Sequence, residues 1–263
     1  MIPRIHLFEL EDLPWFPSVI RDLATDYLHF METVMAAHRP MVPLLADALR
    51  SSGATTVVDL CAGGGGPVVA IREELARLGL NVRFILTDKY PNYDAFKAIA
   101  TRHAGIEGHN APVDATAVPS NLAGFRTMFN AFHHFKPNDA RAVLQSAVAA
   151  RQPIAIFELP ERTIPVIIAT VLLVPFSVML TAPFIRPFRW DRMLFTYLPP
   201  LVPLLCWWDG TVSQLRAYSA GEMQDLAASL GNVGYEWSAG RVKQQGAAPH
   251  VTYLIGIPTR KAA

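Results

Sequence analysis

The chain has few charged residues and almost no cysteine. Lysine, arginine, aspartate and glutamate make up 17% of its 263 residues, and the net charge is +1. A nucleic-acid-binding protein would carry a basic patch or stripe, so this composition argues against that class. Two distant cysteines, Cys61 and Cys206, make neither a disulfide framework nor a zinc site. No His/Cys/Asp cluster has the spacing of metal ligands, and we expect no metal.

The chain also lacks the pattern of a signal peptide. Its first residues, MIPRIHLFELEDLPWF, contain no basic segment followed by a long apolar one. Together with the scarcity of cysteine, this leads us to expect a cytoplasmic protein. Hydrophobic residues make up 51% of the sequence, which is enough for the full core of one elaborated domain.

Segments typical of strands and helices alternate along much of the chain. Two helices come first, at 16–35 and 40–53. Five short apolar strands then alternate with helices, which is typical of a mostly parallel sheet. We predict the strands at 55–60, 82–87, 108–113, 126–132 and 154–158, and the helices between them at 67–78, 94–103 and 138–150, the last capped by Asn138 or Pro137.

The C-terminal part predicts one more helix and a hairpin. Ser219 and Glu222 have the spacing of a capping box, so a helix should run over 219–230. Two strands, at 235–242 and 250–257, then close the fold.

These elements predict a Rossmann-like, doubly wound α/β sheet. It should be mostly parallel with an antiparallel last strand, and it should carry N-terminal helices and an apolar helical insertion. We divide the chain into an N-terminal helical cap, 1–53, and a main domain, 54–263. The alternation of strands and helices stops near Pro160, so the insertion should occupy about 160–218.

The segment Val57–Pro67, VVDLCAGGGGP, carries the strongest functional signal. A strand ends at Asp59, a glycine-rich turn follows, and a helix begins. Glycines let the backbone turn sharply and approach a ligand, and the first N–H groups of a helix attract an anionic group. The dinucleotide fingerprint G-x-G-x-x-G is absent, so the turn differs from that of NAD enzymes.

This segment resembles motif I of class I S-adenosylmethionine (SAM) dependent methyltransferases, D/E-x-G-x-G-x-G. Asp59, Gly63 and Gly65 match the motif, and Cys61 takes the place of its first glycine. The resemblance implies that this turn, including Ala62, packs against the methionine and ribose parts of SAM. A small residue such as cysteine should still fit at the first position.

Later strand ends extend the resemblance. Asp88, followed by Lys89, is similar to the acid that accepts hydrogen bonds from both ribose hydroxyls of SAM, a feature that NAD enzymes share. Asp114 and Ala115 are similar to the residues that face the adenine amino group and ring. On the first helix, Tyr27 is a candidate cofactor contact from a covering helix, although such aromatics often belong to the core.

The segment 127–135, TMFNAFHHF, resembles motif IV, which faces the methyl donor and the substrate in this family. Asn130 could hold the amino or carboxylate end of SAM, or orient a substrate. His133 and His134 are candidates for a general base, with His133 preferred, because imidazole titrates near neutrality. Glu158, which ends the fifth strand at the same sheet edge, completes the candidate catalytic set. Packing histidines and an exposed strand-end carboxylate are the structural alternatives.

The insertion is unusually apolar. Residues 163–185 contain no charge, and a second apolar stretch follows at 194–208. One interpretation of the insertion is a transmembrane hairpin, since the first stretch is long enough to span a bilayer, although its recurring prolines break free-standing helices. A second interpretation is a set of short helices that form an apolar lid over the active site.

A third interpretation adds a peripheral membrane contact to that lid through residues 163–208. The lid would then place a set of arginines and aromatics at the lipid headgroups. This set is Arg186, Arg189 and Arg192 with Phe188 and Trp190. Both lid interpretations imply a hydrophobic acceptor, such as a phenol, a quinone or a lipid-like compound.

The sequence thus predicts SAM-dependent methyl transfer to a hydrophobic small molecule, with O-methylation slightly preferred. The alternatives are a non-catalytic SAM- or lipid-binding protein and a nicotinamide or flavin oxidoreductase. We expect no nucleic-acid partner, because the chain lacks both a basic surface and an N-P-P-Y type tetrad. The acceptor atom and the oligomeric state do not follow from the sequence.

Overall fold

The contacts of the chain group it into two units. The computed structural model describes residues 2–13, 15–243 and 250–259. We call the two groups the sheet unit, residues 36–159 and 219–263, and the helical unit, residues 1–35 and 160–218. The predicted insertion therefore forms one unit with the first 35 residues. The boundary after residue 53 that we predicted does not coincide with this division, because residues 36–53 group with the sheet.

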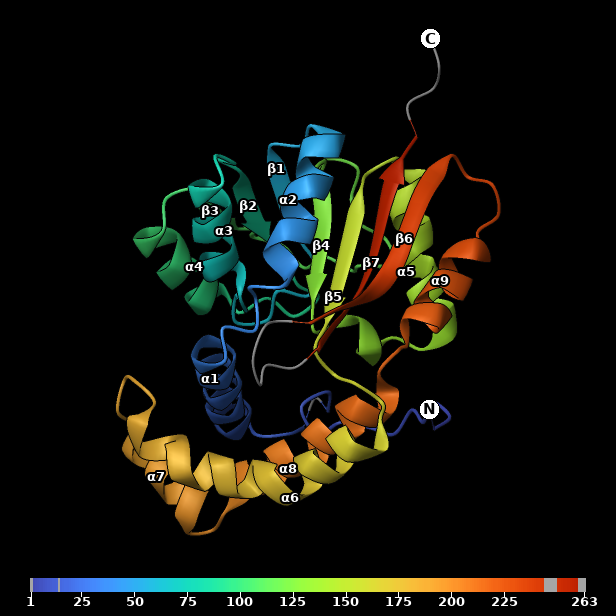
Figure 1. Cartoon of the computed structure of the whole chain (residues 1–263). Coiled ribbons are helices and arrows are strands. Elements are labelled where there is room, and N and C mark those ends of the chain that lie inside the picture. Colours follow the sequence, from blue (N-terminus) through green and yellow to red (C-terminus); the bar gives the residue numbers. More distant parts are fainter. Residues whose placement is uncertain (1, 14, 244–249, 260–263) are drawn as a thin grey trace. The chain divides into compact units, whose positions relative to one another are not determined.

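A seven-stranded sheet forms the centre of the sheet unit in the described part of the chain. Its strands are β1 Thr56–Asp59, β2 Arg83–Leu86, β3 Ile106–Gly108, β4 Phe125–Phe129, β5 Ile154–Glu158, β6 Tyr235–Lys243 and β7 His250–Pro258. They lie in the order β3-β2-β1-β4-β5-β7-β6 (Figure 1). β1 to β5 pair in parallel, and β7 runs antiparallel to both of its neighbours. This confirms the predicted Rossmann-like sheet with an antiparallel last strand.

Two predicted strands differ from the observed ones by more than one residue at an end. The strand predicted at 108–113 was wrong: β3 ends at Gly108, where its pairing with Leu86 of β2 stops. Its polar continuation, HNAP, offers no apolar residue to the core until Val113, and Pro112 cannot donate a ladder hydrogen bond. β4 ends at Phe129 rather than 132, because residues 132–134 form a short 3-10 helix.

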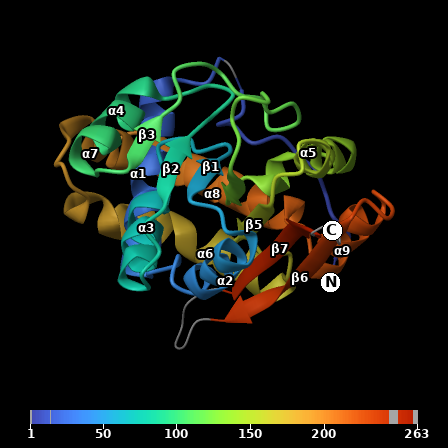
Figure 2. The ribbon, with the colours of Figure 1, turned by 90° about the horizontal axis from the view of Figure 1, so that it is seen from above.

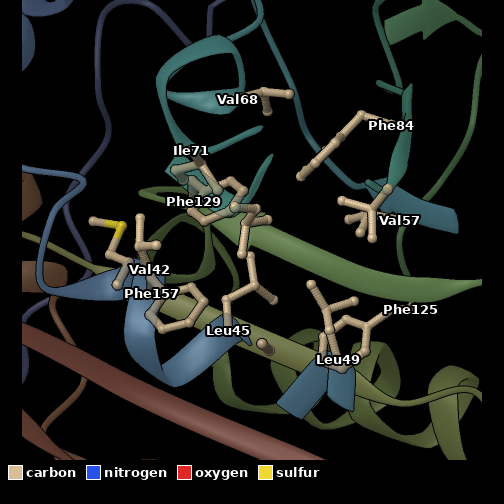
Figure 3. Close-up of a cluster of buried hydrophobic side chains, with 14 of the residues drawn as sticks. Val42, Leu45, Leu49, Val57, Val68, Ile71, Phe84, Phe125, Phe129 and Phe157 are labelled. Atoms are coloured by element: carbon tan, nitrogen blue, oxygen red, sulfur yellow. The ribbon is translucent and has the colours of Figure 1, made fainter. Parts of the chain in front are cut away.

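Helices cover both faces of this sheet. They are α2 Met41–Ser52, α3 Val68–Arg77, α4 Tyr93–Arg102, α5 Pro137–Ala149 and α9 Ala220–Ala228. Seen from above, α2 and α3 lie on one face and α5 and α9 on the other (Figure 2). On the first face, apolar side chains of two helices meet those of four strands, and each fully buried one contributes about 1.5–3 kcal/mol. Those labelled in Figure 3 are Val42, Leu45, Leu49, Val57, Val68, Ile71, Phe84, Phe125, Phe129 and Phe157.

The ends of these helices follow local chemistry. α2 stops at Gly53, whose φ of 71° lies in the left-handed region that glycine adopts without strain. The capping box predicted for α9 is confirmed, since Ser219 and Glu222 exchange both of its hydrogen bonds. The cap predicted for α5 was wrong: Lys136 is the N-cap, and Pro137 takes the first helical position, where its missing N–H costs nothing.

The helical unit packs its helices around a second core. It contains α1 Ser18–Val34, α6 Ile164–Thr181, the 3-10 helix η2 Ala182–Phe184, α7 Trp190–Tyr197 and α8 Leu201–Arg216. α6 and α1 pack on α8. Buried side chains of α1, α6 and α8 form one cluster with Ile185. Its buried members are Ile20, Leu23, Ala24, Tyr27, Val178, Ile185, Val202, Leu205 and Cys206.

One expectation about this unit was wrong. The insertion is not broken at each proline, because α6 continues through Pro175 for 18 residues. A proline removes one intrahelical hydrogen bond, and the packing of α6 on α8 outweighs that loss. The segment WWDGT, residues 207–211, lies inside α8.

Buried charges tie the first residues of the chain to α8. The Asp209 carboxylate accepts hydrogen bonds from the backbone N–H groups of Leu10 and Glu11, over 2.7 and 3.0 Å. Burial raises the pKa of Asp209 to about 7. Two turns further along α8, buried Arg216 pairs with the carboxylate of Asp12 at 2.9 Å.

One described helix, Ile164–Phe184, is long and apolar enough to cross a membrane, judged by length and composition alone. Only 6% of its most apolar 18-residue stretch is buried. Most of this helix therefore presents apolar side chains on its outside.

Candidate functional site

The candidate site lies at the carboxyl ends of the parallel strands. The strand order reverses between β1 and β4, and ligands of doubly wound sheets bind at that point, outside the carboxyl ends. Asp59 ends β1, and Asp88 follows β2 by two residues. Asn130 directly follows β4, and Glu158 ends β5. The topology thus brings four of the predicted polar residues to one edge.

Asp59 joins three strands at this edge. Its side chain is buried, and the Thr127 hydroxyl of β4 donates a hydrogen bond of 2.7 Å to Asp59 Oδ1. The backbone N–H and the hydroxyl of Thr87 both donate to the Asp59 carbonyl oxygen, over 2.9 and 2.8 Å. Burial raises the pKa of Asp59 to about 8. The negative charge of Asp88 also raises this pKa, whereas the hydrogen bond from Thr127 lowers it. This carboxyl is therefore mostly protonated at neutral pH.

The glycine-rich turn needs its left-handed backbone. Cys61, Gly63 and Gly65 have φ values of 58°, 54° and 99°. A Cβ at Gly65 would come within 2.2 Å of the Ile99 Cδ1 atom, whereas one at Gly63 would meet nothing within 4 Å. Cys61 fits by size, but its backbone takes a conformation that costs a residue with a side chain roughly 1–2 kcal/mol. Burial also raises the pKa of the Cys61 thiol, so this group stays a neutral thiol.

Asp88 holds the turn in place. Its Oδ2 atom accepts the backbone N–H of Gly63 over 2.9 Å, and its Oδ1 atom accepts that of Tyr90 over 2.8 Å. The preceding Ala62 N–H donates to the carbonyl of Thr87 over 2.9 Å. A carboxylate has about four lone-pair sites, so these two bonds leave capacity for two further donors. A pair of vicinal hydroxyls is a ligand group that meets this requirement.

Asp114 and Lys89 form an ion pair next to this carboxylate. Lys89 Nζ lies 2.7 Å from Asp114 Oδ2, and the Thr116 N–H and hydroxyl donate to Asp114 Oδ1 over 2.9 and 2.7 Å. The hydrogen bonds from Lys89 and Thr116 lower the pKa of Asp114 to about 2. Asp114 is therefore a fixed negative charge at this edge, and the adjacent Ala115 is buried.

Asn130 connects the ends of β4 and β5. It adopts a φ of 53°, and its N–H donates to the Phe157 carbonyl over 2.9 Å. Its side-chain oxygen accepts the N–H of Leu159 over 2.8 Å. The geometry therefore gives Asn130 a structural role at this edge, and its predicted contact with a ligand stays a prediction.

His133 and Glu158 form a buried pair. Glu158 Oε2 lies 2.5 Å from His133 Nδ1, and Glu158 Oε1 accepts the N–H of Phe132 over 2.7 Å. Glu158 is fully buried, so the alternative of an exposed strand-end carboxylate was wrong. His134 is half-buried, and its ring centroid lies 4.3 Å from that of His133. A carboxylate on one imidazole nitrogen fixes the orientation and the tautomer of the ring, an arrangement that general bases use.

The structure brings most of the predicted site residues together in the sheet unit and leaves one outside it. Tyr27 belongs to the helical unit, where its hydroxyl hydrogen-bonds to Ser177 and burial raises its pKa. Its contact with a cofactor therefore stays a prediction. The residues in the sheet unit are Asp59, Cys61, Ala62, Gly63, Gly65, Asp88, Lys89, Asp114, Ala115, Asn130, His133, His134 and Glu158.

Sequence reasoning missed the threonines that position these acids. Thr127 binds Asp59, Thr87 binds the carbonyl of the same residue, and Thr116 binds Asp114. A signal for Thr127 was available, because a buried hydroxyl within an apolar strand must find a hydrogen-bond partner. Its partner could not be named without the pairing of β4 with β1.

Solved structures share this fold, although no protein-family model and no curated relative match the chain. The plantazolicin methyltransferase BpumL in complex with SAH has a TM-score of 0.56 at 11% identity, covering 90% of this chain and 90% of its own. Human N-acetylserotonin methyltransferase in complex with SAM has a TM-score of 0.52 at 12% identity, and the match covers 94% of this chain and 59% of that protein. The methyltransferase domain of bacterial CtHen1-CN has a TM-score of 0.50 at 11% identity, and the match covers 84% of this chain and 99% of that domain. At such low sequence identity, these TM-scores show a shared fold.

Proposed function

We propose that this protein is a SAM-dependent methyltransferase that acts on a hydrophobic small molecule. The observation that carries the proposal is the hydrogen bond between Asp88 and Gly63, which fixes an acidic strand end against an open glycine-rich turn. The fold is shared with proteins whose structures hold SAM or SAH, which supports the same cofactor class.

The residues at the strand ends fit SAM. Asp88 has the acceptor capacity for the two ribose hydroxyls, and the space beside Gly63 would admit the body of the ligand. Asp114, with its low pKa, would accept the adenine amino group while keeping Lys89 as its partner. Ala115 would line the ring. When bound, SAM supplies an electrophilic methyl group attached to a sulfonium.

The His133–Glu158 pair suits an acceptor that must lose a proton. Glu158 occupies Nδ1, so His133 would take a proton through its other ring nitrogen, Nε2. The carboxylate then stabilises the imidazolium that forms, and general-base catalysis of this kind typically contributes 10²–10⁴-fold. The pair therefore favours O-methylation, for example of a phenol or a quinol. The apolar segment 163–208 supports a hydrophobic acceptor.

Calorimetry with three ligands tests the proposal. The purified chain should bind SAM and SAH with micromolar-range affinity and should not bind NADH, because the G-x-G-x-x-G fingerprint is absent. The protein would then be incubated with radiolabelled SAM and a panel of hydrophobic phenols and quinols, and transfer of the labelled methyl group to each acceptor would be measured. Binding of NADH without SAM would refute the cofactor assignment. Binding of SAM without transfer to any acceptor would favour a non-catalytic SAM-binding protein.

A further inference from the structure

The exposed apolar residues of the chain concentrate on one part of the helical unit. Among the described residues, fifteen of the 25 exposed large apolar side chains lie between residues 164 and 204. We call this set the apolar face. Its members are Ile164, Ile168, Leu172, Leu173, Phe176, Met179, Leu180, Phe184, Phe188, Trp190, Leu194, Tyr197, Leu198, Leu201 and Leu204.

Within its own unit, α6 uses only a narrow stripe for packing. Thr170 and Val178 are its buried residues, and Gly210 of α8 lies close to Thr170. Elsewhere on the helix, Leu173, Phe176 and Leu180 are 62%, 72% and 74% exposed. Monomeric soluble proteins rarely leave so many large apolar side chains exposed on consecutive helices, so this set points to an occupant.

Charge is confined to one end of the apolar face. Between residues 163 and 208 the charged residues are Arg186, Arg189, Asp191 and Arg192. Arg192 is buried and donates to the Ile185 and Pro187 carbonyls and to Asp26. The prediction that Arg192 lies at the lipid headgroups was therefore wrong.

Two arginines of this end differ in what they can offer. Arg189 pairs with Asp191 at 2.6 Å. Arg186 is exposed, and the described residues give it no acidic partner. Next to it, the rings of Phe188 and Trp190 meet edge to face, with centroids 5.1 Å apart. An unpaired cation with aromatic rings beside an apolar surface is the composition of a lipid headgroup contact.

We infer that the apolar face docks on the surface of an anionic membrane, with α6 lying along the leaflet. Apolar side chains of α6 and α7 would enter the acyl boundary, and Arg186 would bind lipid phosphate. This inference concerns binding alone and does not depend on the proposed methyl transfer.

The contacts of α6 favour this orientation over one that spans the bilayer. α6 packs along α8, and α8 carries the buried Asp209 and Arg216. Arg216 holds Glu9 at 3.3 Å as part of an ion-pair network. A spanning α6 would draw this network toward the hydrocarbon, where charged groups are costly. Lying in the interface leaves the part of α8 that carries Asp209 and Arg216 on the aqueous side.

Vesicle co-sedimentation of the full chain tests the inference. The probes are phosphatidylcholine vesicles with and without phosphatidylglycerol. The wild type should bind both and should prefer the anionic ones. The double variant Leu173→Asp/Phe176→Asp should partition at least about tenfold more weakly, because each buried large apolar side chain is worth about a factor of ten or more. Leu78→Asp, at a site 48% exposed on the sheet unit, is the matched control and should bind as the wild type does.

The headgroup contact has its own pair of variants. Arg186→Glu should abolish the preference for anionic vesicles, whereas Arg102→Glu, an exposed arginine of the sheet unit, should keep it. Three outcomes would overturn the inference. One is a monomer that binds neither vesicle type. Another is a dimer, seen by analytical ultracentrifugation, that the double variant dissociates. The last is a vesicle-bound form that resists alkaline extraction with residues 164–184 protected from protease, which would identify a spanning helix.

Discussion

Replacing Asp59 with asparagine should change how the stability of the protein depends on pH. Burial raises the pKa of this carboxyl to about 8 in the folded chain, from 3.8 as its ordinary value. Between these two values the native state binds one proton more than the unfolded state. The free energy of unfolding of the wild type therefore decreases as the pH rises through this window. Below the window both states are protonated, and the contribution no longer changes.

The magnitude follows from the same two values. One pKa unit corresponds to about 1.4 kcal/mol, so the free energy of unfolding of the wild type should fall by about 1.4 kcal/mol per pH unit within this window. From about pH 5 to pH 7 the loss is roughly 3 kcal/mol. An asparagine side chain carries no charge, and its oxygen can still accept the Thr127 hydroxyl. Asp59→Asn should therefore remove this slope and stabilise the protein near neutrality.

Urea unfolding at a series of pH values measures this difference. Circular dichroism would give the free energy of unfolding of the wild type, of Asp59→Asn and of Asp94→Asn, which removes an exposed carboxylate of α4. The gap between the wild type and Asp59→Asn should widen steadily with pH, while Asp94→Asn should follow the wild type. Parallel curves for the wild type and Asp59→Asn would refute the reasoning, because they would mean that Asp59 binds no extra proton in the native state.

Three further changes probe the site and the helical unit. Asp88→Ala should weaken SAM binding by about 1.5–3 kcal/mol in calorimetry, the range for lost charge-assisted hydrogen bonds, and an unchanged Kd in a folded variant would contradict its role. Glu158→Gln should slow transfer to the best acceptor of the phenol panel by about 10²–10⁴-fold while SAM affinity stays the same; equal losses of both would make the pair with His133 structural. Arg192→Met should lower the urea midpoint by an amount equivalent to about 1–3 kcal/mol, since it leaves the Ile185 and Pro187 carbonyls without this donor and removes the shorter ion pair of Asp26, and a shift below about 0.5 kcal/mol would contradict that account.

Much of the sheet could be predicted because its signals are local. β1, β2 and β5 are short apolar runs that end at or near an acidic residue, and their predicted bounds were close to the observed ones. The same acids, Asp59 and Asp88, lie at the strand ends, so the edge that holds the candidate site followed from the strand assignments. β3 was misplaced because its single buried residue, Ile106, gives no periodicity.

Contacts between distant segments could not be predicted in this way. The pair of His133 with Glu158 joins residues 25 apart in sequence, and it depends on the alignment of β4 with β5. The continuity of α6 through Pro175 depends on packing against α8, which overrides the local preference of proline. The grouping of residues 1–35 with 160–218 has no sequence signal either, because neither segment contains a motif that specifies its partner.

The discontinuous composition of the helical unit has a consequence for biosynthesis. Its first segment, residues 1–35, leaves the ribosome well before its second segment, residues 160–218. At a synthesis rate of about 5–20 residues per second, α1 waits roughly 10–40 s for the helices that cover its apolar side. During that interval Leu23 and Tyr27, which are buried in the finished unit, have no native partner from α6 or α8. A nascent chain of this design should therefore recruit a ribosome-associated chaperone at its first helix, and a pause in translation before residue 218 should lengthen that association.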